Sequence, residues 1–239
     1  MVKKYYGIWV AVLLMVVMAS CAKDPDIPTG DTGNFVSGTY DGHEYVDLGL
    51  PSGTLWATCN LGASSPEDYG DYYAWGETTT KSTYNWSTYQ YCNGDGNKLT
   101  KYCSKSGYGN NGFTDNLTVL QSSDDAATVN WGSGWCIPTK KQWEELRNNT
   151  TVLWTTKNGE IGVKFFVKNG NSLFLPTAGY WTISGMGNFE YCYYWSKTLL
   201  VDDPRQAWDV FISQYDCTFS LLDRCYGSPV RPVRSTSKD

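Results

Sequence analysis

The spacing of apolar residues separates one helix from a series of short strands. After Pro138, Trp143 and Leu146 are three residues apart, which places both on one face of an α-helix. Thr139 and Gln142 have the spacing of a capping box, and Pro138 keeps the residue before it extended. The pattern predicts a helix that begins after Thr139.

Most other apolar stretches are short and are bounded by glycine, proline or asparagine, as β-strands are. We expect a short helical turn at 124–127 and strands at 45–48, 55–57, 151–155, 162–168, 172–176, 179–181, 189–196, 207–213, 217–222 and 228–233. Within 191–196, period two places Tyr191, Tyr193 and Trp195 on one face of a strand. Cys192 and Tyr194 lie on the other. Both faces are aromatic, so at least one of them must be covered in a meander of short strands.

The first twenty residues have the features of an export signal. Lys3 and Lys4 precede an apolar run at 7–19 that is too short and wrongly flanked for a membrane-spanning helix. The sequence MASC at 18–21 resembles the end of a bacterial lipoprotein signal, in which Cys21 becomes the acylated first residue. We therefore predict a signal peptide at 1–20 and lipidation at Cys21, whose acyl chains hold the protein on a membrane. The alternative is an ordinary secretory signal, which leaves Cys21 as a free or paired thiol.

Composition divides the rest of the chain into a tether, one domain and a short tail. Residues 21–38 contain almost nothing that could be buried, which predicts a flexible tether. Residues 39–234 are long enough for one domain with a sizeable core, and 235–239 are predicted to be a disordered tail. Aromatic residues make up 15% of the chain, so we expect an aromatic core and a partly aromatic surface. Trp131, Trp135 and Trp143 are expected to be buried between the helix and a sheet.

The charge of the chain argues against nucleic acid as a partner. The formal charge is -5, and it becomes about -7 when Lys3 and Lys4 leave with the signal. The sequence contains no basic run or patch, which nucleic-acid binding ordinarily needs. We therefore expect no nucleic-acid partner.

The cysteines leave several disulfide pairings open. The chain has 8 of them, and an exported protein is in a compartment where disulfides persist. Cys92 and Cys103 lie on either side of a hairpin signal at 93–97 and could face each other. Cys217 and Cys225 could pair with each other, or one of them with Cys192.

The remaining signals do not predict a metal site or a cofactor. Cys59 and Cys136 lie in tryptophan-flanked segments, and we expect them to be buried small hydrophobes. No Cys-x-x-Cys spacing occurs, which removes the usual zinc and redox signatures. Carboxylates gather in the loop at 62–77, but without the regular ligand spacing of an EF-hand.

Seven landmarks occur in a fixed order along the chain. They are EYVDLGLPSGTLWA at 44–57, YAWGE at 73–77, DAA at 125–127, WGSGWCIPT at 131–139, LPTAGY at 175–180, YWS at 194–196 and VRPV at 230–233. This order resembles the Fibrobacter succinogenes major paralogous domain family and covers nearly the whole mature domain. That family is similar to C-type lectin-like folds. The resemblance therefore implies a single α+β C-type lectin-like domain, with twisted antiparallel strands, one or two short helices and long loops.

The resemblance to lectins has limits. Calcium-dependent lectins use a Glu-Pro-Asn or Gln-Pro-Asp loop and a Trp-Asn-Asp strand, and the sequence has neither. Calcium-mediated sugar binding is therefore not implied. The segment YGSPVR at 226–231 also resembles the end of variable proteins that retroelements diversify. In those proteins the ligand surface lies in the final third of the chain, so this second resemblance implies a diversified C-terminal third.

Catalytic chemistry is not predicted. The chain has a single histidine, His43, and no nucleophile-elbow sequence accompanies it. We therefore expect His43 to be a surface or strand-edge residue and not a catalytic base. A glycosidase needs two carboxylates that face one cleft, and the sequence cannot bring any two together. The candidate carboxylates are Glu77, Asp125, Glu160 and Asp209.

Residues suited to recognition concentrate between 191 and 226. Aromatic side chains there provide rigid contact area, and Arg, Gln and Asp provide directional hydrogen bonds. The predicted ligand-binding residues are Tyr191, Tyr193, Arg205, Gln206, Trp208, Gln214, Tyr215, Asp223 and Arg224. The polar members and Tyr215 are expected to be exposed, whereas packing in the core is the stronger interpretation for Trp208.

These observations favour a lipid-anchored, non-catalytic recognition domain for a protein or glycan ligand. The start of the mature chain, AKDPD at 22–26, resembles surface-export signals of Bacteroidota lipoproteins. The expected location is therefore the outer membrane, with the domain facing the cell exterior. Two rival functions are a surface enzyme acting on glycan or protein, and a structural subunit of a surface assembly.

Overall fold

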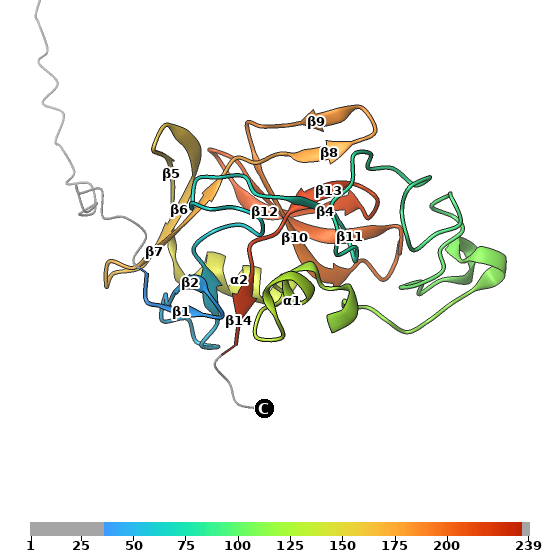
Figure 1. Cartoon of the computed structure of the whole chain (residues 1–239), viewed down its shortest axis with the longest axis horizontal. Helices are drawn as coiled ribbons and strands as arrows, with labels where there is room; N and C mark the ends of the chain where they lie inside the picture. The colour runs from blue at the N-terminus through green and yellow to red at the C-terminus, as the bar shows by residue number, and fades with distance from the viewer. Residues whose placement is uncertain (1–35, 236–239) are drawn as a thin grey trace, which may run out of the picture. The chain divides into compact units, whose positions relative to one another are not determined.

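In the computed structural model, which describes residues 36–235, fourteen strands form four antiparallel sheets and two short α-helices lie beside them (Figure 1). The predicted mixture of short antiparallel strands and few helices is confirmed as a mostly β, α+β-like architecture. No helix in this part of the chain is long and apolar enough to cross a membrane. The predicted signal peptide, Cys21, the tether up to residue 35 and the tail from residue 236 lie outside the described residues.

The central sheet is a three-stranded meander. It consists of β10 (Cys192–Leu199), β11 (Gln206–Ile212) and β12 (Cys217–Asp223). Alternation along β10 sends Cys192 and Tyr194 into one core cluster and Tyr193 and Trp195 into a second cluster. Both faces of the strand are therefore covered, as its two-sided aromatic pattern requires.

A second meander packs on the first core cluster. It consists of β5 (Thr151–Lys157), β6 (Glu160–Phe166) and β7 (Ser172–Pro176). Val163 and Phe165 of β6 and Leu175 of β7 are buried in the cluster that also holds Tyr194. The turn between β6 and β7 contains Gly170 at φ 93°, a left-handed conformation that glycine adopts without a steric penalty.

The two ends of the domain meet in a third sheet. Its strands, in the order β1-β2-β3-β14, are Gly38–Tyr40, His43–Val46, Leu55–Ala57 and Val233–Arg234. Val233 pairs with Trp56. The N–H of Ser37 donates to the carbonyl of Tyr45 at 2.8 Å, so strand pairing begins just before the predicted domain boundary at residue 39.

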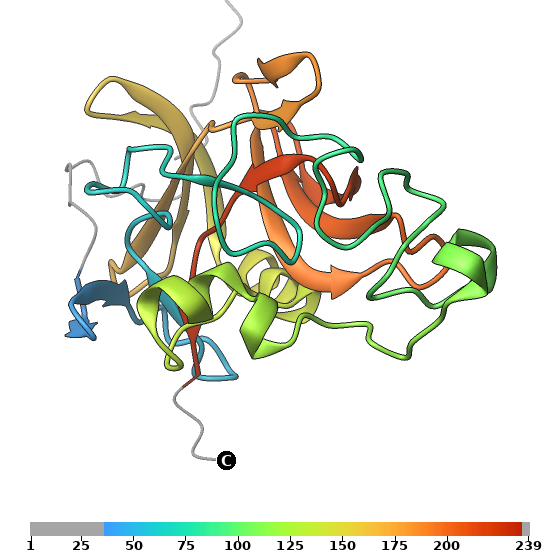
Figure 2. The same ribbon diagram turned by 45° about the vertical axis from the view of Figure 1, so that its right-hand side comes forward.

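The fourth sheet carries a hairpin that stands out from the domain. Its strands, in the order β4-β13-β8-β9, are Tyr72–Ala74, Gly227–Pro229, Tyr180–Thr182 and Gly185–Gly187. The β8–β9 and β5–β6 hairpins project on the same side, away from the two α-helices (Figures 1 and 2).

Helix α2 (Lys140–Asn149) begins where the capping box predicts. The hydroxyl of Thr139 accepts the Gln142 N–H at 3.2 Å, and Gln142 Oε1 accepts the Thr139 N–H at 2.9 Å. Trp143 and Leu146 are buried on its inner face. The Trp143 ring lies 4.6 Å from that of Trp56, which fixes the helix against β3.

Helix α1 (Ala126–Trp131) is also capped by a side chain. The carboxylate of Asp125 accepts the N–H groups of Ala127 and Thr128. Trp135 is buried as predicted, but Trp131 is only half-buried. It lies at the end of α1, and its ring stacks on His43 at 3.7 Å, so the prediction that it lies between helix and sheet is wrong. Single-turn 3₁₀ segments occur at Ser106–Tyr108, Asn110–Gly112 and Ser122–Asp124.

None of the disulfide pairings considered from the sequence forms. All cysteines in residues 36–235 are free thiols. The turn closes with a hydrogen bond from the N–H of Asn93 to the carbonyl of Lys98, so Cys92 pairs as an isolated β-bridge with Leu99. Cys103 lies beyond this hairpin and does not face Cys92.

The strand order separates the remaining candidates. Cys192 and Cys217 both pair with Ile212, from opposite sides of β11, so this strand lies between them. Cys225 is buried in a separate cluster. The sequence had suggested that Cys59 and Cys136 are buried, but both are only half-buried.

Candidate functional site

A groove of about 540 Å³ lies between the β5–β6 hairpin and the end of β11. We term it the aromatic groove. Its lining residues are Trp154, Ile161, Phe189, Glu190, Tyr191, Phe211, Ser213, Gln214 and Tyr215. A concave, mainly apolar surface with a few polar groups is typical of ligand-binding sites.

One wall of the groove follows from alternation along the β5–β6 hairpin. Trp154 is paired with Val163, and Ile161 lies two residues from Val163 on the same face. Farther from the hairpin tip this face enters the core through Val163 and Phe165. Near the tip it leaves the core, so Ile161 is 49% exposed and Trp154 is half-buried in the groove wall.

The opposite wall ends in a tight turn between β11 and β12. The N–H of Ser213 donates to the carbonyl of Asp216 at 2.8 Å, and the Ser213 hydroxyl accepts the N–H groups of Tyr215 and Asp216. These bonds hold the backbone of the turn. The side chain of Tyr215 is nevertheless 91% exposed, so it projects from the rim of the groove into solvent.

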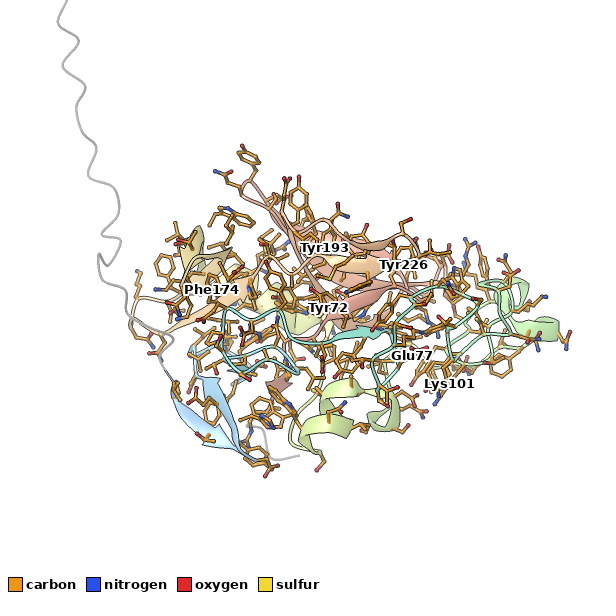
Figure 3. The ribbon with its side chains drawn as sticks, turned by 45° about the horizontal axis from the view of Figure 1, so that its top comes forward. Tyr72, Glu77, Lys101, Phe174, Tyr193 and Tyr226 are labelled. Atoms are coloured by element: carbon orange, nitrogen blue, oxygen red, sulfur yellow. The ribbon has the colours of Figure 1, made fainter. Side chains whose placement is uncertain are left out.

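Aromatic rings continue from the groove across the sheet. The Phe211 ring contacts those of Tyr191 and Tyr193, at 5.3 and 5.2 Å between centroids. The Tyr180 ring contacts those of Tyr193 and Tyr226, at 4.7 and 6.0 Å between centroids. Figure 3 shows Tyr193 and Tyr226 near each other. Burial raises the pKa of Tyr193 to about 12, so its hydroxyl stays neutral at physiological pH.

An acidic rim adjoins the groove at the tip of the β5–β6 hairpin. A cavity of about 230 Å³ there is lined by Tyr69 and by Glu67, Asp68 and Glu160. The Tyr69 hydroxyl donates to Glu160 at 3.1 Å, and the Tyr69 ring lies 6.4 Å from that of Phe189 in the groove wall. The two cavities therefore share a boundary. We term Glu67, Asp68, Glu160 and the groove residue Glu190 the acidic rim.

Comparison with known proteins does not identify the chain. No family model, no curated protein and no solved structure matches it. The function is therefore inferred from the side chains of the groove and its rim.

The structure brings together three of the predicted ligand-binding residues. Tyr191, Gln214 and Tyr215 all line the aromatic groove, and Gln214 and Tyr215 are exposed as predicted. Tyr193 lies behind the groove and reaches it through its contact with Phe211.

Three others lie at the far end of the same hairpin. β11 runs from Gln206 to the groove, so Arg205 and Gln206 are a full strand length from Gln214. Gln206 pairs with Asp223 and donates to its carboxylate at 3.4 Å. Arg205 forms an ion pair with Asp203 at 2.6 Å. Arg205, Gln206 and Asp223 were expected to be exposed, but all three are half-buried. Their polar groups are used within the domain, in the pairs Gln206–Asp223 and Arg205–Asp203.

Trp208 lies on the opposite face of the central sheet. Its ring lies beneath Lys140 of α2, at 4.7 Å from Nζ to the ring centroid. The sequence had favoured packing for this residue, and it is half-buried under the helix. It therefore does not contribute to the groove.

Arg224 was expected to be exposed, and this prediction is wrong. Its side chain is 0% exposed. The guanidinium donates to the Tyr89 hydroxyl and to the carbonyls of Lys101, Tyr102 and Pro204. All its nitrogens are used in holding loops together, so it is a structural residue.

The groove residues that sequence reasoning missed are Trp154, Ile161, Phe189, Glu190, Phe211 and Ser213. Phe189, Glu190, Phe211 and Ser213 fall in predicted strands or at their ends, so their proximity to Tyr191 and Gln214 was a signal that could have found them. Trp154 and Ile161 come from a distant hairpin. No local pattern shows that this hairpin lies beside β11.

A smaller cavity surrounds His43. It has a volume of about 270 Å³ and its lining includes Glu44, Cys59 and Trp131. His43 is the first residue of β2, which lies between β1 and β3 and is not an edge strand, and its side chain is half-buried under the Trp131 ring. Burial lowers its pKa, so the imidazole is neutral at physiological pH.

The candidate catalytic carboxylates have separate local roles. Glu77 forms an ion pair with Lys81 at 2.7 Å, Asp125 caps α1, and Asp209 is buried in β11. Glu160 belongs to the acidic rim. Among residues 36–235, no group of three or more His, Cys, Asp and Glu side chains is arranged to hold a metal ion.

Proposed function

We propose that this protein is a non-catalytic recognition domain that binds a protein or glycan ligand in the aromatic groove. The observation that carries the proposal is the convergence of five aromatic side chains, from segments far apart in sequence, on one open groove. Rigid aromatic rings supply contact area at a low cost in conformational entropy. Ser213, Gln214 and the tyrosine hydroxyls supply directional hydrogen bonds around them.

We further propose that the domain has a C-type lectin-like fold of the Fibrobacter succinogenes major paralogous domain type. The ordered sequence landmarks support this proposal, and the pairing of β14 with β3 is consistent with it because it brings both ends of the domain together. The second resemblance, to retroelement-diversified proteins, places variation in the final third of the chain. All the groove residues except Trp154 lie in that third.

The N-terminal sequence supports a lipid anchor at Cys21 on the outer membrane, with the domain facing outwards. Replacing Cys21 with serine removes the thiol that would be acylated. We expect Cys21→Ser protein to move from the membrane fraction to the soluble fraction, measured by immunoblotting of both fractions. The control is Cys59→Ser, which should leave the distribution unchanged. Retention of Cys21→Ser protein on membranes would contradict the anchor.

Arrays of glycans and of surface and secreted proteins test the recognition function. The purified chain should bind a ligand at micromolar concentration or below and leave it chemically unchanged. The main rival is a surface enzyme. Turnover of an arrayed polysaccharide or protein, without stable binding, would favour that rival and contradict our proposal.

A further inference from the structure

The charged side chains that line the aromatic groove and the adjoining cavity are all carboxylates. Glu190 lies in the groove, and Glu67, Asp68 and Glu160 line the adjoining cavity. None of these four carboxylates takes part in an ion pair within residues 36–235. Lys157 pairs in register with Glu160 across the β5–β6 turn, but the two side chains form no ion pair.

One oxygen of the acidic rim also lacks a hydrogen bond. Asn158 donates to Glu67 Oε1, whereas Glu67 Oε2 is buried and has no partner in the described structure. A buried acceptor without a donor is costly, and no described residue offsets the negative charge of Glu67. The Tyr69 hydroxyl donates to one oxygen of Glu160, which holds this carboxylate in the adjoining cavity.

We propose that the groove takes a positively charged segment of a protein partner. This inference rests on the recognition function proposed above and adds the chemistry of the ligand. An aromatic or aliphatic side chain of the segment lies among Trp154, Phe189 and Tyr191, and a neighbouring Lys or Arg reaches Glu160 or Glu190. An arginine fits best, because its guanidinium bonds to carboxylates and stacks on aromatic rings.

The same charges argue against an acidic glycan. Sugars that carry carboxylate or sulfate groups would meet carboxylates at both the groove and its rim, which costs binding energy. A neutral glycan could stack on the rings but would leave the rim carboxylates without counter-charges. The combination of apolar rings with an unpaired acidic rim is complementary to a basic, apolar peptide.

Two fluorescently labelled synthetic peptides test this inference with the full chain in detergent. Both have one tryptophan in a glycine-serine background; one has an arginine on each side of the tryptophan, and the other has a glutamate at each of these positions. We expect the arginine peptide to bind about tenfold more tightly in fluorescence anisotropy, because two partly exposed ion pairs each contribute a factor of about two to five. The preference should nearly vanish at about 0.5 M NaCl, where screening is strong.

Matched charge variants locate the effect. Glu160→Gln with Glu190→Gln should abolish most of the preference for the arginine peptide. Asp95→Asn with Asp202→Asn removes the same number of charges from exposed positions outside the groove and should leave the preference intact. Equal binding of the two peptides, tighter binding of the glutamate peptide, or binding of neither would overturn the inference. The recognition function itself would stand in each case if an array ligand still bound in a way that depends on the groove.

Discussion

Replacing Arg224 with alanine is expected to lower the free energy of unfolding by about 3–5 kcal/mol, which is the usual range when one partner of a buried charged network is removed. The guanidinium uses all its nitrogens on acceptors 2.8–3.1 Å away, three of which are backbone carbonyls. It also lies 5.0 Å from the centre of the Trp75 ring. Alanine would leave these carbonyls buried without donors and open a cavity beside the rings.

Urea unfolding of the wild-type and Arg224→Ala proteins measures this difference. Arg205→Ala is the matched control, because Arg205 precedes the same hairpin but is partly exposed and pairs with Asp203 near the surface. We expect the control to lose less than about 1 kcal/mol. A loss of the same small size for Arg224→Ala would show that the buried network contributes little and would contradict its structural role.

The contribution of Asp209 to the stability of the domain is expected to fall as the pH rises from about 4 to about 7, because Asp209 holds its proton in the folded state. Burial raises the pKa of Asp209 to about 7, whereas an aspartate in an unfolded chain titrates near 4. Between these values the folded protein binds a proton that the unfolded chain has lost. The contribution of Asp209 to the free energy of unfolding therefore falls by about 1.4 kcal/mol per pH unit, or about 4 kcal/mol in total.

The geometry around Asp209 explains why the neutral form is preferred. The residue is 0% exposed, and the Ser220 hydroxyl donates to its Oδ1 at 2.7 Å. Oδ2 has no partner among the described residues, and no cation pairs with the carboxylate there. Above pH 7 an ionised Asp209 is thus buried with one hydrogen bond, which is unfavourable.

Asp209→Asn measures this contribution because asparagine has the shape of the protonated acid and no charge. At pH 8 the variant should be more stable than the wild-type protein by up to about 4 kcal/mol, and near pH 4 the two should agree within about 1 kcal/mol. Asp125 is also buried with a raised pKa, but it is present in both proteins, so its effect cancels in the difference. Asp216→Asn, at an exposed position, is the control. Equal stability of Asp209→Asn and wild type at pH 8 would contradict the raised pKa.

Local signals in the sequence were sufficient for much of the secondary structure. Thr139 and Gln142 form the capping box that their spacing predicts, and Trp143 and Leu146 are buried on one helix face. Helix caps and strand alternation depend on neighbours within a few residues, so the sequence alone can show them.

Long-range packing was not accessible in this way. Arg224 is a charged residue near a turn, which suggests exposure, but its acceptors at Lys101, Tyr102 and Pro204 come from distant loops. The groove had the same limitation. Tyr191 and Tyr215 were expected to be recognition residues, whereas the wall formed by Trp154 depends on which hairpin packs beside β11.

The affinity of an array ligand for two matched variants tests the central claim, that the aromatic groove is the recognition site. Tyr215→Ala removes a ring that is 91% exposed at the groove rim, and Ile183→Ala removes an apolar side chain that is 70% exposed on the β8–β9 hairpin. Neither change should disturb the core. We predict that Tyr215→Ala weakens binding at least about tenfold, because tyrosine is enriched among the few interface residues that carry most of the binding energy, and that Ile183→Ala leaves binding unchanged. Unchanged affinity in Tyr215→Ala, with a loss in Ile183→Ala, would contradict the groove as the site.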